Sequence, residues 1–241
     1  MRADLVRHSR RPAPSVRGAR RRPKTAYHEA GHCLARLWMG HRFHAAIVRK
    51  PVEAAAGPIL DRRNRLVDCE GFVDAYDIVS PFLSPKLLEE TRFGVGISRE
   101  EYVAGCILSA EMEIIDCVSG IAAEVRFSRQ SWFSAVLDGG TSDWEKATSV
   151  AAIWFPDAAG AAVEAACDRA RALVRAPASW RAIELMAARL LACGRMDQGD
   201  AELDFTAAFG RKPPGRNDWT AYWPPPPDAF ASAQMPEMAD A

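Results

Sequence analysis

The chain has 241 residues, 49% of them hydrophobic, and a formal net charge of zero. This length allows one large domain or two small ones with a hydrophobic core. No stretch approaches the roughly 18 apolar residues of a membrane span, and the first two dozen residues lack the apolar centre of a secretory signal. We therefore expect a soluble, cytoplasmic protein without a transmembrane segment. The cysteines form no C-x-x-C pair, so reduced and mostly buried thiols are expected at Cys33, Cys69, Cys106, Cys117, Cys167 and Cys193.

The positive charge is concentrated at the N-terminus. Residues 1–24 contain nine lysine and arginine side chains against the single carboxylate of Asp4, a net charge of +8. Because such a segment has little apolar surface to bury, we expect residues 1–23 to form a basic disordered arm. The alternative is that residues 1–24 contact nucleic acid, an anionic surface or an acidic partner.

The first predicted helix carries the motif H-E-x-x-H. Pro23 and Thr25 are suitable helix-starting residues, apolar side chains recur at helical spacing through residues 27–38, and Gly40 is a typical C-terminal stop. Gly31 lowers helix propensity by roughly 1 kcal/mol, which indicates a close approach to the backbone at that point.

On a helix, His28 and His32 lie one turn apart on one face, and Glu29 lies beside them. Two neutral imidazoles can bind Zn²⁺ and leave a position open for water, and the carboxylate can accept the proton of that water. These residue types predict a zinc hydrolase. The alternative is a chance match on a helix that holds two histidines.

Two short segments after this helix favour β-structure. Residues 45–48 form a β-leaning run within 43–49, and residues 70–76 could form a second strand before the breakers Pro81 and Pro85. Together they predict a small, irregular sheet.

The remainder of the chain has mostly helical patterns. Ser98 and Glu101 form a capping box that opens a long helix towards Phe127, with Gly120 permitting close packing or a break. A second box, Ser142 to Glu145, opens a helix that ends at Pro156, and two more helices are expected at about 158–174 and 179–195. The predicted fold class is mainly α with a small irregular β-sheet, and residues 211–241 read as a Pro/Ala-rich tail.

A catalytic zinc site needs a third protein ligand. Ala35 and Trp38 occupy the places where a metzincin would have Gly and His, which excludes that class. His8, His41 and His44 are expected to be surface or loop residues. Asp143 is the best candidate because it begins a helix after the glycine-bearing loop 139–140; the alternative is a carboxylate that only interacts with the helix dipole, worth about 0.3 to 1 kcal/mol.

Three segments resemble the FtsH family of ATP-dependent zinc metalloproteases. Residues 26–32 match its A-Y-H-E-A-G-H, residues 120–124 resemble its G-R-x-A-E with Ile121 in place of Arg, and residues 143–151 resemble its D-L-x-x-A-T-x-x-A with Trp144 in place of Leu. The resemblance implies an FtsH-peptidase-like domain over residues 24–210. It also implies that Asp143 is the third zinc ligand and that Glu124 lies close to the metal site.

The resemblance implies a zinc metalloendopeptidase in which His28, His32 and Asp143 bind Zn²⁺ and Glu29 is the general base. The sequence contains no G-x-x-x-x-G-K-[ST] motif. We therefore expect substrates to be unfolded or flexible proteins and peptides, or a separate AAA+ ATPase to unfold them. The alternative function is a non-catalytic zinc-binding adaptor or regulatory domain with a basic interaction arm.

Overall fold

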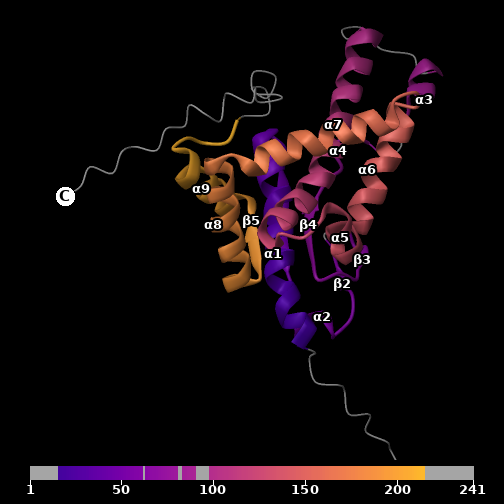
Figure 1. Cartoon of the computed structure of the whole chain (residues 1–241). Coiled ribbons are helices and arrows are strands. Elements are labelled where there is room, and N and C mark those ends of the chain that lie inside the picture. Colours follow the sequence, from indigo (N-terminus) through magenta and orange to yellow (C-terminus); the bar gives the residue numbers. More distant parts are fainter. Residues whose placement is uncertain (1–15, 62, 81–82, 91–97, 215–241) are drawn as a thin grey trace, which may run out of the picture.

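The computed structural model describes residues 16–61, 63–80, 83–90 and 98–214. Within these residues the protein is mainly helical with a small antiparallel sheet, which confirms the expected fold class at this level. Helix α1 (Val16–Trp38) lies in the middle, with α8 and α9 on one side and α4 and α6 towards the other (Figure 1). Among the described residues, no helix has both the length and the apolar character needed to cross a membrane.

Helix α1 begins earlier than the sequence suggested. It starts at Val16 and includes Pro23, so residues 16–23 are its first turns rather than part of a disordered arm. Tertiary contact explains part of this difference, because Arg22 Nη2 donates a hydrogen bond to the carbonyl of Leu191, 2.8 Å away on α8. The rest of the predicted arm, residues 1–15, lies outside the described residues. At the other end, Gly40 adopts a φ of 70°, as expected for a glycine helix stop.

Both predicted strands are present. Strand β1 (Phe43–Val48) pairs antiparallel with β4 (Gly71–Ala75), and its other edge pairs with β5 (Arg195–Asp197), giving the order β4-β1-β5. The short α2 (Pro51–Ala54) and the hairpin of β2 (Ile59–Leu60) and β3 (Leu66–Val67) connect β1 to β4. Because β1 is internal, β4 presents a sheet edge without a partner strand among the described residues.

Helix α4 follows the short α3 (Pro85–Glu90) and spans Arg99–Ser128. The predicted capping box is formed: Ser98 Oγ accepts from the Glu101 amide, and the Glu101 carboxylate accepts from the Ser98 amide. Helix α4 packs closely along α1, since a Cβ at Gly31 would lie 2.6 Å from the Ser119 carbonyl oxygen and 2.8 Å from the Ala123 Cβ. The close approach expected at Gly31 is therefore confirmed, and α4 continues through Gly120 without a break.

The second predicted capping box is wrong. The chain is already helical through α5 (Trp132–Ala135) and a π-helical segment, η1 (Val136–Gly140), which runs directly into α6 (Thr141–Trp154). Ser142 therefore lies inside continuous helical structure and has no free helix start to cap.

The last helices are α7 (Ala159–Arg175), α8 (Pro177–Cys193) and α9 (Gln198–Phe209). The two predicted helices correspond to α7 and α8. Residues of α1, α4, α7, α8 and α9 share one hydrophobic core, which contains Leu34, Ile115, Met186 and Phe205. All the cysteines are free thiols, and most are buried, as expected. Most of the predicted tail, residues 215–241, lies outside the described residues.

Candidate metal centre

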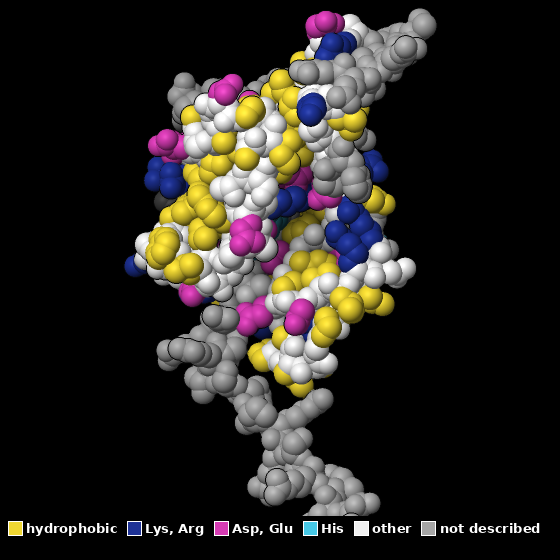
Figure 2. All heavy atoms as spheres, turned by 90° about the vertical axis from the view of Figure 1, so that its right-hand side faces the viewer, with side chains coloured by type: hydrophobic (Ala, Val, Ile, Leu, Met, Phe, Trp, Pro, Cys, Tyr) yellow, Lys and Arg dark blue, Asp and Glu magenta, His cyan; other side chains and the backbone are white. Residues whose placement is uncertain are grey.

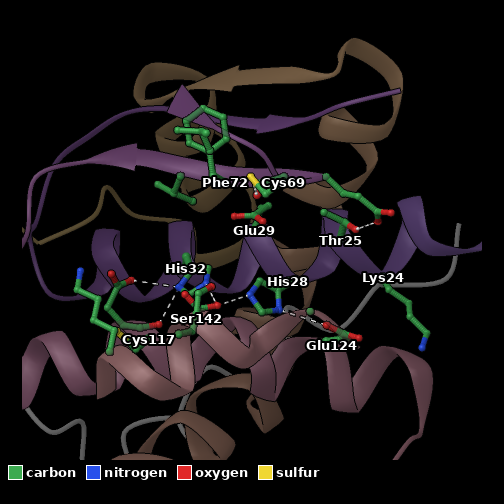
Figure 3. Close-up of a pocket in the computed structure, with 18 of the residues that line it drawn as sticks. Lys24, Thr25, His28, Glu29, His32, Cys69, Phe72, Cys117, Glu124 and Ser142 are labelled. Atoms are coloured by element: carbon green, nitrogen blue, oxygen red, sulfur yellow. Dashed lines mark hydrogen bonds and ion pairs between the residues drawn. The ribbon is translucent and has the colours of Figure 1, made fainter. Parts of the chain in front are cut away.

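The two histidines of the H-E-x-x-H motif lie on the side of α1 that faces α4 and α6. His28 and His32 are 6% and 7% exposed, and their ring centroids are 4.9 Å apart. The neighbouring Glu29 is 5% exposed and lies between α1 and strand β4, as Figure 3 shows. The motif therefore forms the wall of a cleft rather than a solvent-exposed helix face.

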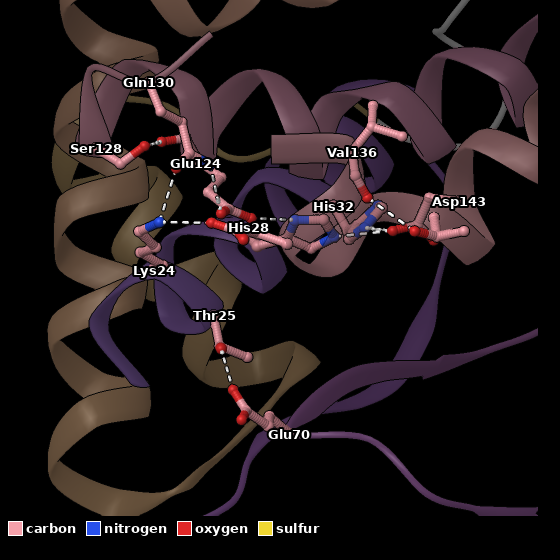
Figure 4. A network of polar contacts seen from close by, with 12 residues as sticks. Lys24, Thr25, His28, His32, Glu70, Glu124, Ser128, Gln130, Val136 and Asp143 are labelled. Carbon is pink, nitrogen blue, oxygen red and sulfur yellow. Dashed lines mark hydrogen bonds and ion pairs between the residues drawn. The ribbon is translucent and has the colours of Figure 1, made fainter. Parts of the chain in front are cut away.

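Asp143 reaches these histidines from the first turn of α6. Its Oδ2 lies 2.9 Å from His28 Nε2 and 3.6 Å from His32 Nε2 (Figure 4). Two ligands about 2.1 Å from a tetrahedral zinc ion are separated by ~3.4 Å, and the two measured spacings lie on either side of this value. Among the described residues, His28, His32 and Asp143 form the group of potential metal ligands, with ligand atoms within 4.8 Å of one another.

Gly120 of α4 provides the space in which the two imidazoles meet. A Cβ at this position would lie 2.7 Å from His28 Nε2 and would overlap His32 Nε2. A real Cβ does not approach other atoms so closely, so any larger residue would displace the ligand atoms. The absence of a side chain at Gly120 therefore lets α4 pack closely on α1 and leaves room for the Nε2 atoms of both histidines.

Each histidine is oriented by a group on α4 that contacts its Nδ1. His28 Nδ1 lies 3.2 Å from Glu124 Oε2, and His32 Nδ1 lies 2.8 Å from the Asp116 carbonyl oxygen. Both groups accept hydrogen bonds, so they favour the tautomer with a proton on Nδ1 and a lone pair on Nε2. Glu124, which was expected to lie close to the metal ligands, is thus in contact with one of the candidate ligands, His28.

Asp116 was not found by the sequence reasoning. Its carboxylate forms a buried ion pair with Arg36, with Oδ2 and Nη2 2.6 Å apart, and its backbone carbonyl, which is held in α4, accepts from His32 Nδ1. The available signal was the pair of carboxylates, Glu113 and Asp116, within the otherwise apolar run 112–118 of a predicted buried helix. A buried charge in such a run indicates a partner, although it does not identify one.

Carboxylates surround the imidazoles and determine their charge. Burial alone would lower the pKa of His28, but hydrogen bonds to Asp143 and Glu124 outweigh it and raise that pKa to about 9. Burial likewise favours the neutral form of Asp143, yet the two imidazoles hold the pKa of Asp143 well below its usual range. The site is thus built to stabilise positive charge between these groups, and a divalent cation would replace the imidazole protons.

The environment of Glu29 shifts its pKa towards neutrality. Burial, partly offset by the nearby His28 and His32, raises the pKa of Glu29 to about 7. A general base is most effective when its pKa is near the working pH. Strand β4 closes over this carboxylate, since a Cβ at Gly71 would lie 2.9 Å from Glu29 Oε1.

The site opens into a cleft of about 700 Å³. The hollow between α6 and the β2–β4 segment contains both acidic and basic side chains, as Figure 2 shows. Its lining includes the apolar side chains of Leu66, Val67, Phe72 and Val73 and the polar side chains of Lys24, Asp138, Ser142 and Lys146. The cleft therefore presents the candidate metal ligands and Glu29 to a molecule larger than water.

The other two histidines in the described part of the chain, His41 and His44, do not join this centre. His44 is exposed on β1, where its Nε2 lies 3.4 Å from Arg195 Nη2, and His41 follows the end of α1. His8 lies outside the described residues. The expectation that His41 and His44 are not ligands agrees with their positions.

Comparison with models of known protein families found no match for this chain. A search among curated proteins also found no significant similarity.

Proposed function

We propose that the protein is a zinc-dependent endopeptidase. The observation that carries this proposal is the convergence of Asp143 on the H-E-x-x-H helix, from 115 residues away in the sequence. A helix with two histidines by chance would not require a carboxylate against both Nε2 atoms or a glycine facing them. The resemblance of residues 26–32, 120–124 and 143–151 to FtsH peptidases supports the same function.

In this proposal, His28, His32 and Asp143 hold Zn²⁺. The ion, when bound, supplies Lewis-acid polarisation of the scissile carbonyl and increases the acidity of water. Glu29 accepts the proton of the attacking water and passes it to the leaving amine. Glu124 and the Asp116 carbonyl keep the two imidazoles in the tautomer that directs Nε2 to the metal.

Strand β4 is the proposed place for the substrate backbone. Of the two strands predicted from the sequence, β1 cannot take a further strand because β4 and β5 occupy both of its edges. An extended peptide can add to an unpartnered strand edge through main-chain hydrogen bonds. Since Gly71 of β4 lies against Glu29, a peptide paired with β4 would pass close to the base.

This binding mode requires a substrate that can become extended. We therefore propose unfolded or flexible proteins and peptides as the substrate class. Folded proteins would need a separate AAA+ ATPase to unfold them.

The test compares the wild type with Glu29→Gln. We expect both proteins to bind zinc and only the wild type to cleave unfolded casein, because glutamine keeps the shape of the side chain but cannot accept the proton. Glu145→Gln is the matched control, since Glu145 is an exposed carboxylate on the helix that carries Asp143. It should leave cleavage unchanged.

Each outcome has a distinct meaning. Full activity of Glu29→Gln would refute the assigned base. Zinc binding without cleavage by the wild type would favour the non-catalytic adaptor, and absence of zinc from the wild type would refute the metal centre.

A further inference from the structure

The structure contains a chain of polar contacts that extends from the metal centre to the mouth of the cleft. Beyond Glu124, the carboxylate that contacts His28, lies Gln130, and beyond Gln130 lies Lys24 (Figure 4). Neither Gln130 nor Lys24 belongs to the three motifs from which the site was predicted. We propose that Gln130 is a positioning residue that orients His28 through Glu124, with Lys24 fixing the direction of the Gln130 amide. This inference rests on the proposed zinc-binding function.

Gln130 contacts the Glu124 carboxylate directly. Gln130 Nε2 donates to Glu124 Oε1 at 2.9 Å, while the other carboxylate oxygen, Oε2, faces His28 Nδ1 at 3.2 Å. Glu124 is 4% exposed, so few other donors can reach its carboxylate. With one oxygen occupied by the amide, the carboxylate plane is fixed and the second oxygen is directed at the imidazole.

Lys24 determines which way the Gln130 amide points. An amide can rotate by 180° and exchange its oxygen for its nitrogen, which would turn the Gln130 oxygen towards Glu124. Lys24 Nζ lies 2.7 Å from Gln130 Oε1, and an ammonium can only donate. The lysine therefore holds the amide oxygen on its own side and directs the Nε2 donor to Glu124.

Lys24 is placed where it can contact several elements of the site. It lies one turn before His28 on α1, and its Nζ also forms an ion pair with Asp138 Oδ2 at 3.0 Å. Asp138 belongs to η1, the segment that runs directly into α6 and Asp143. The same lysine thus connects the helix of the two histidines, the end of α4 and the segment that leads to the third ligand.

These contacts hold the His28 imidazole in one orientation, so its Nε2 is directed at the proposed metal position. If Glu124 is free to rotate, it no longer selects one imidazole orientation, and zinc binding must order the side chain. Loss of a direct partner of a metal-binding histidine weakens metal binding by about 10- to 100-fold. Because Gln130 acts through Glu124, we expect a smaller effect, about 3- to 10-fold.

The experiment measures zinc affinity by competition with a chelator in the full chain carrying Gln130→Leu or Gln130→Glu. The leucine variant removes the donor. The glutamate variant keeps an oxygen for Lys24 but presents a second oxygen to Glu124. Added negative charge alone would tighten the binding of a cation, so weaker binding by Gln130→Glu would indicate that Glu124 is displaced from His28, because it has lost its donor and is repelled by the new carboxylate.

The matched control is Gln198→Leu. Gln198 is also half-buried and also bridges two groups, accepting from the Phe43 amide and donating to Glu202, but it contacts no residue of the metal centre. It should lower stability without changing zinc affinity. The visible absorption spectrum of the Co²⁺-substituted protein provides a second measurement, and only the Gln130 variants should change it.

We expect both Gln130 variants to bind zinc about 3- to 10-fold more weakly than the wild type and the Gln198 variant. Unchanged zinc affinity and an unchanged cobalt spectrum in Gln130→Leu would overturn the inference, as would tighter binding by Gln130→Glu. A wild type that binds no zinc would instead refute the proposed function, so the two failures are distinguishable.

Discussion

Gly120→Ala is the substitution that tests the architecture of the metal centre most directly. A Cβ at Gly120 would lie 2.7 Å from His28 Nε2 and overlap His32 Nε2, so the two imidazoles would have to move away from each other or from α4. Gly105 provides a matched control in the same helix, because a Cβ there meets nothing within 4 Å. The two variants add the same methyl group to α4 and differ only in its surroundings.

The expected magnitudes follow from this difference. Alanine is favoured over glycine inside a helix by roughly 0.5–1 kcal/mol, so Gly105→Ala should raise the free energy of unfolding by about that amount. At Gly120, overpacking costs roughly 1–3 kcal/mol and exceeds this gain. We therefore expect the zinc-free Gly120→Ala protein to be about 1 kcal/mol less stable than the wild type.

The effect on the metal should be larger than the effect on folding. Binding sites tolerate displacements of only about 0.5 Å, and an ordinary van der Waals contact would require both Nε2 atoms to shift by more than that. We expect zinc affinity to fall at least ~100-fold, equivalent to about 2.7 kcal/mol. Urea unfolding of the zinc-free proteins and chelator competition measure the two quantities separately. Wild-type zinc affinity in Gly120→Ala would show that the ligand atoms lie elsewhere and would refute the site geometry.

Two further variants test the groups around the histidines. Asp143→Asn removes the anionic ligand and should weaken zinc binding more than any outer partner does, by over ~100-fold in the same competition assay; an affinity equal to that of the wild type would return Asp143 to the role of a helix-dipole partner. Arg36→Met leaves the Asp116 carboxylate buried without its cation and should lower the free energy of unfolding by about 3 kcal/mol. Burial opposes ionisation of Asp116, but Arg36 outweighs it and keeps the pKa of Asp116 below its usual value of about 3.9, so this stabilisation should be present at neutral pH and disappear as the pH falls below about 4. Acid unfolding of the zinc-free variant and wild type compares the two; equal losses of stability would contradict a role for the pair.

The parts of the site that could be predicted are formed by residues within one or two helical turns of each other in the sequence. His28, Glu29 and His32 share a turn of α1, so their spacing alone defines a face. The capping box at Ser98 and the strands 43–48 and 71–75 are also local signals, and the structure contains them. The position of Asp143 is different: spacing left its role open, and only the resemblance assigned it to the zinc.

The features that were missed depend on contacts between distant segments. Strand β5 has three residues, Arg195–Asp197, without strong β-propensity, and it becomes a strand because it pairs with β1. The group that orients His32 is the backbone carbonyl of Asp116. Every residue has such a carbonyl, so the residue type does not indicate this role. The start of α1 was misjudged for a similar reason, because an arginine-rich segment indicates a solvated arm unless a partner such as the Leu191 carbonyl is known.

These contacts divide the centre into two parts with different origins. The imidazoles and their two orienting groups all belong to α1 and α4, which meet closely at Gly31, so one helix pair fixes both Nε2 atoms. Asp143 comes from α6, whose preceding segment η1 is π-helical, a rare conformation that occurs mostly as a single turn within α-helices and often at functional sites. Lys24 is the side chain that connects these parts, since it contacts both Gln130 and Asp138. The histidine pair should consequently stay in place when the third ligand is removed, and small changes in η1 should alter the distance of Asp143 from an otherwise intact pair.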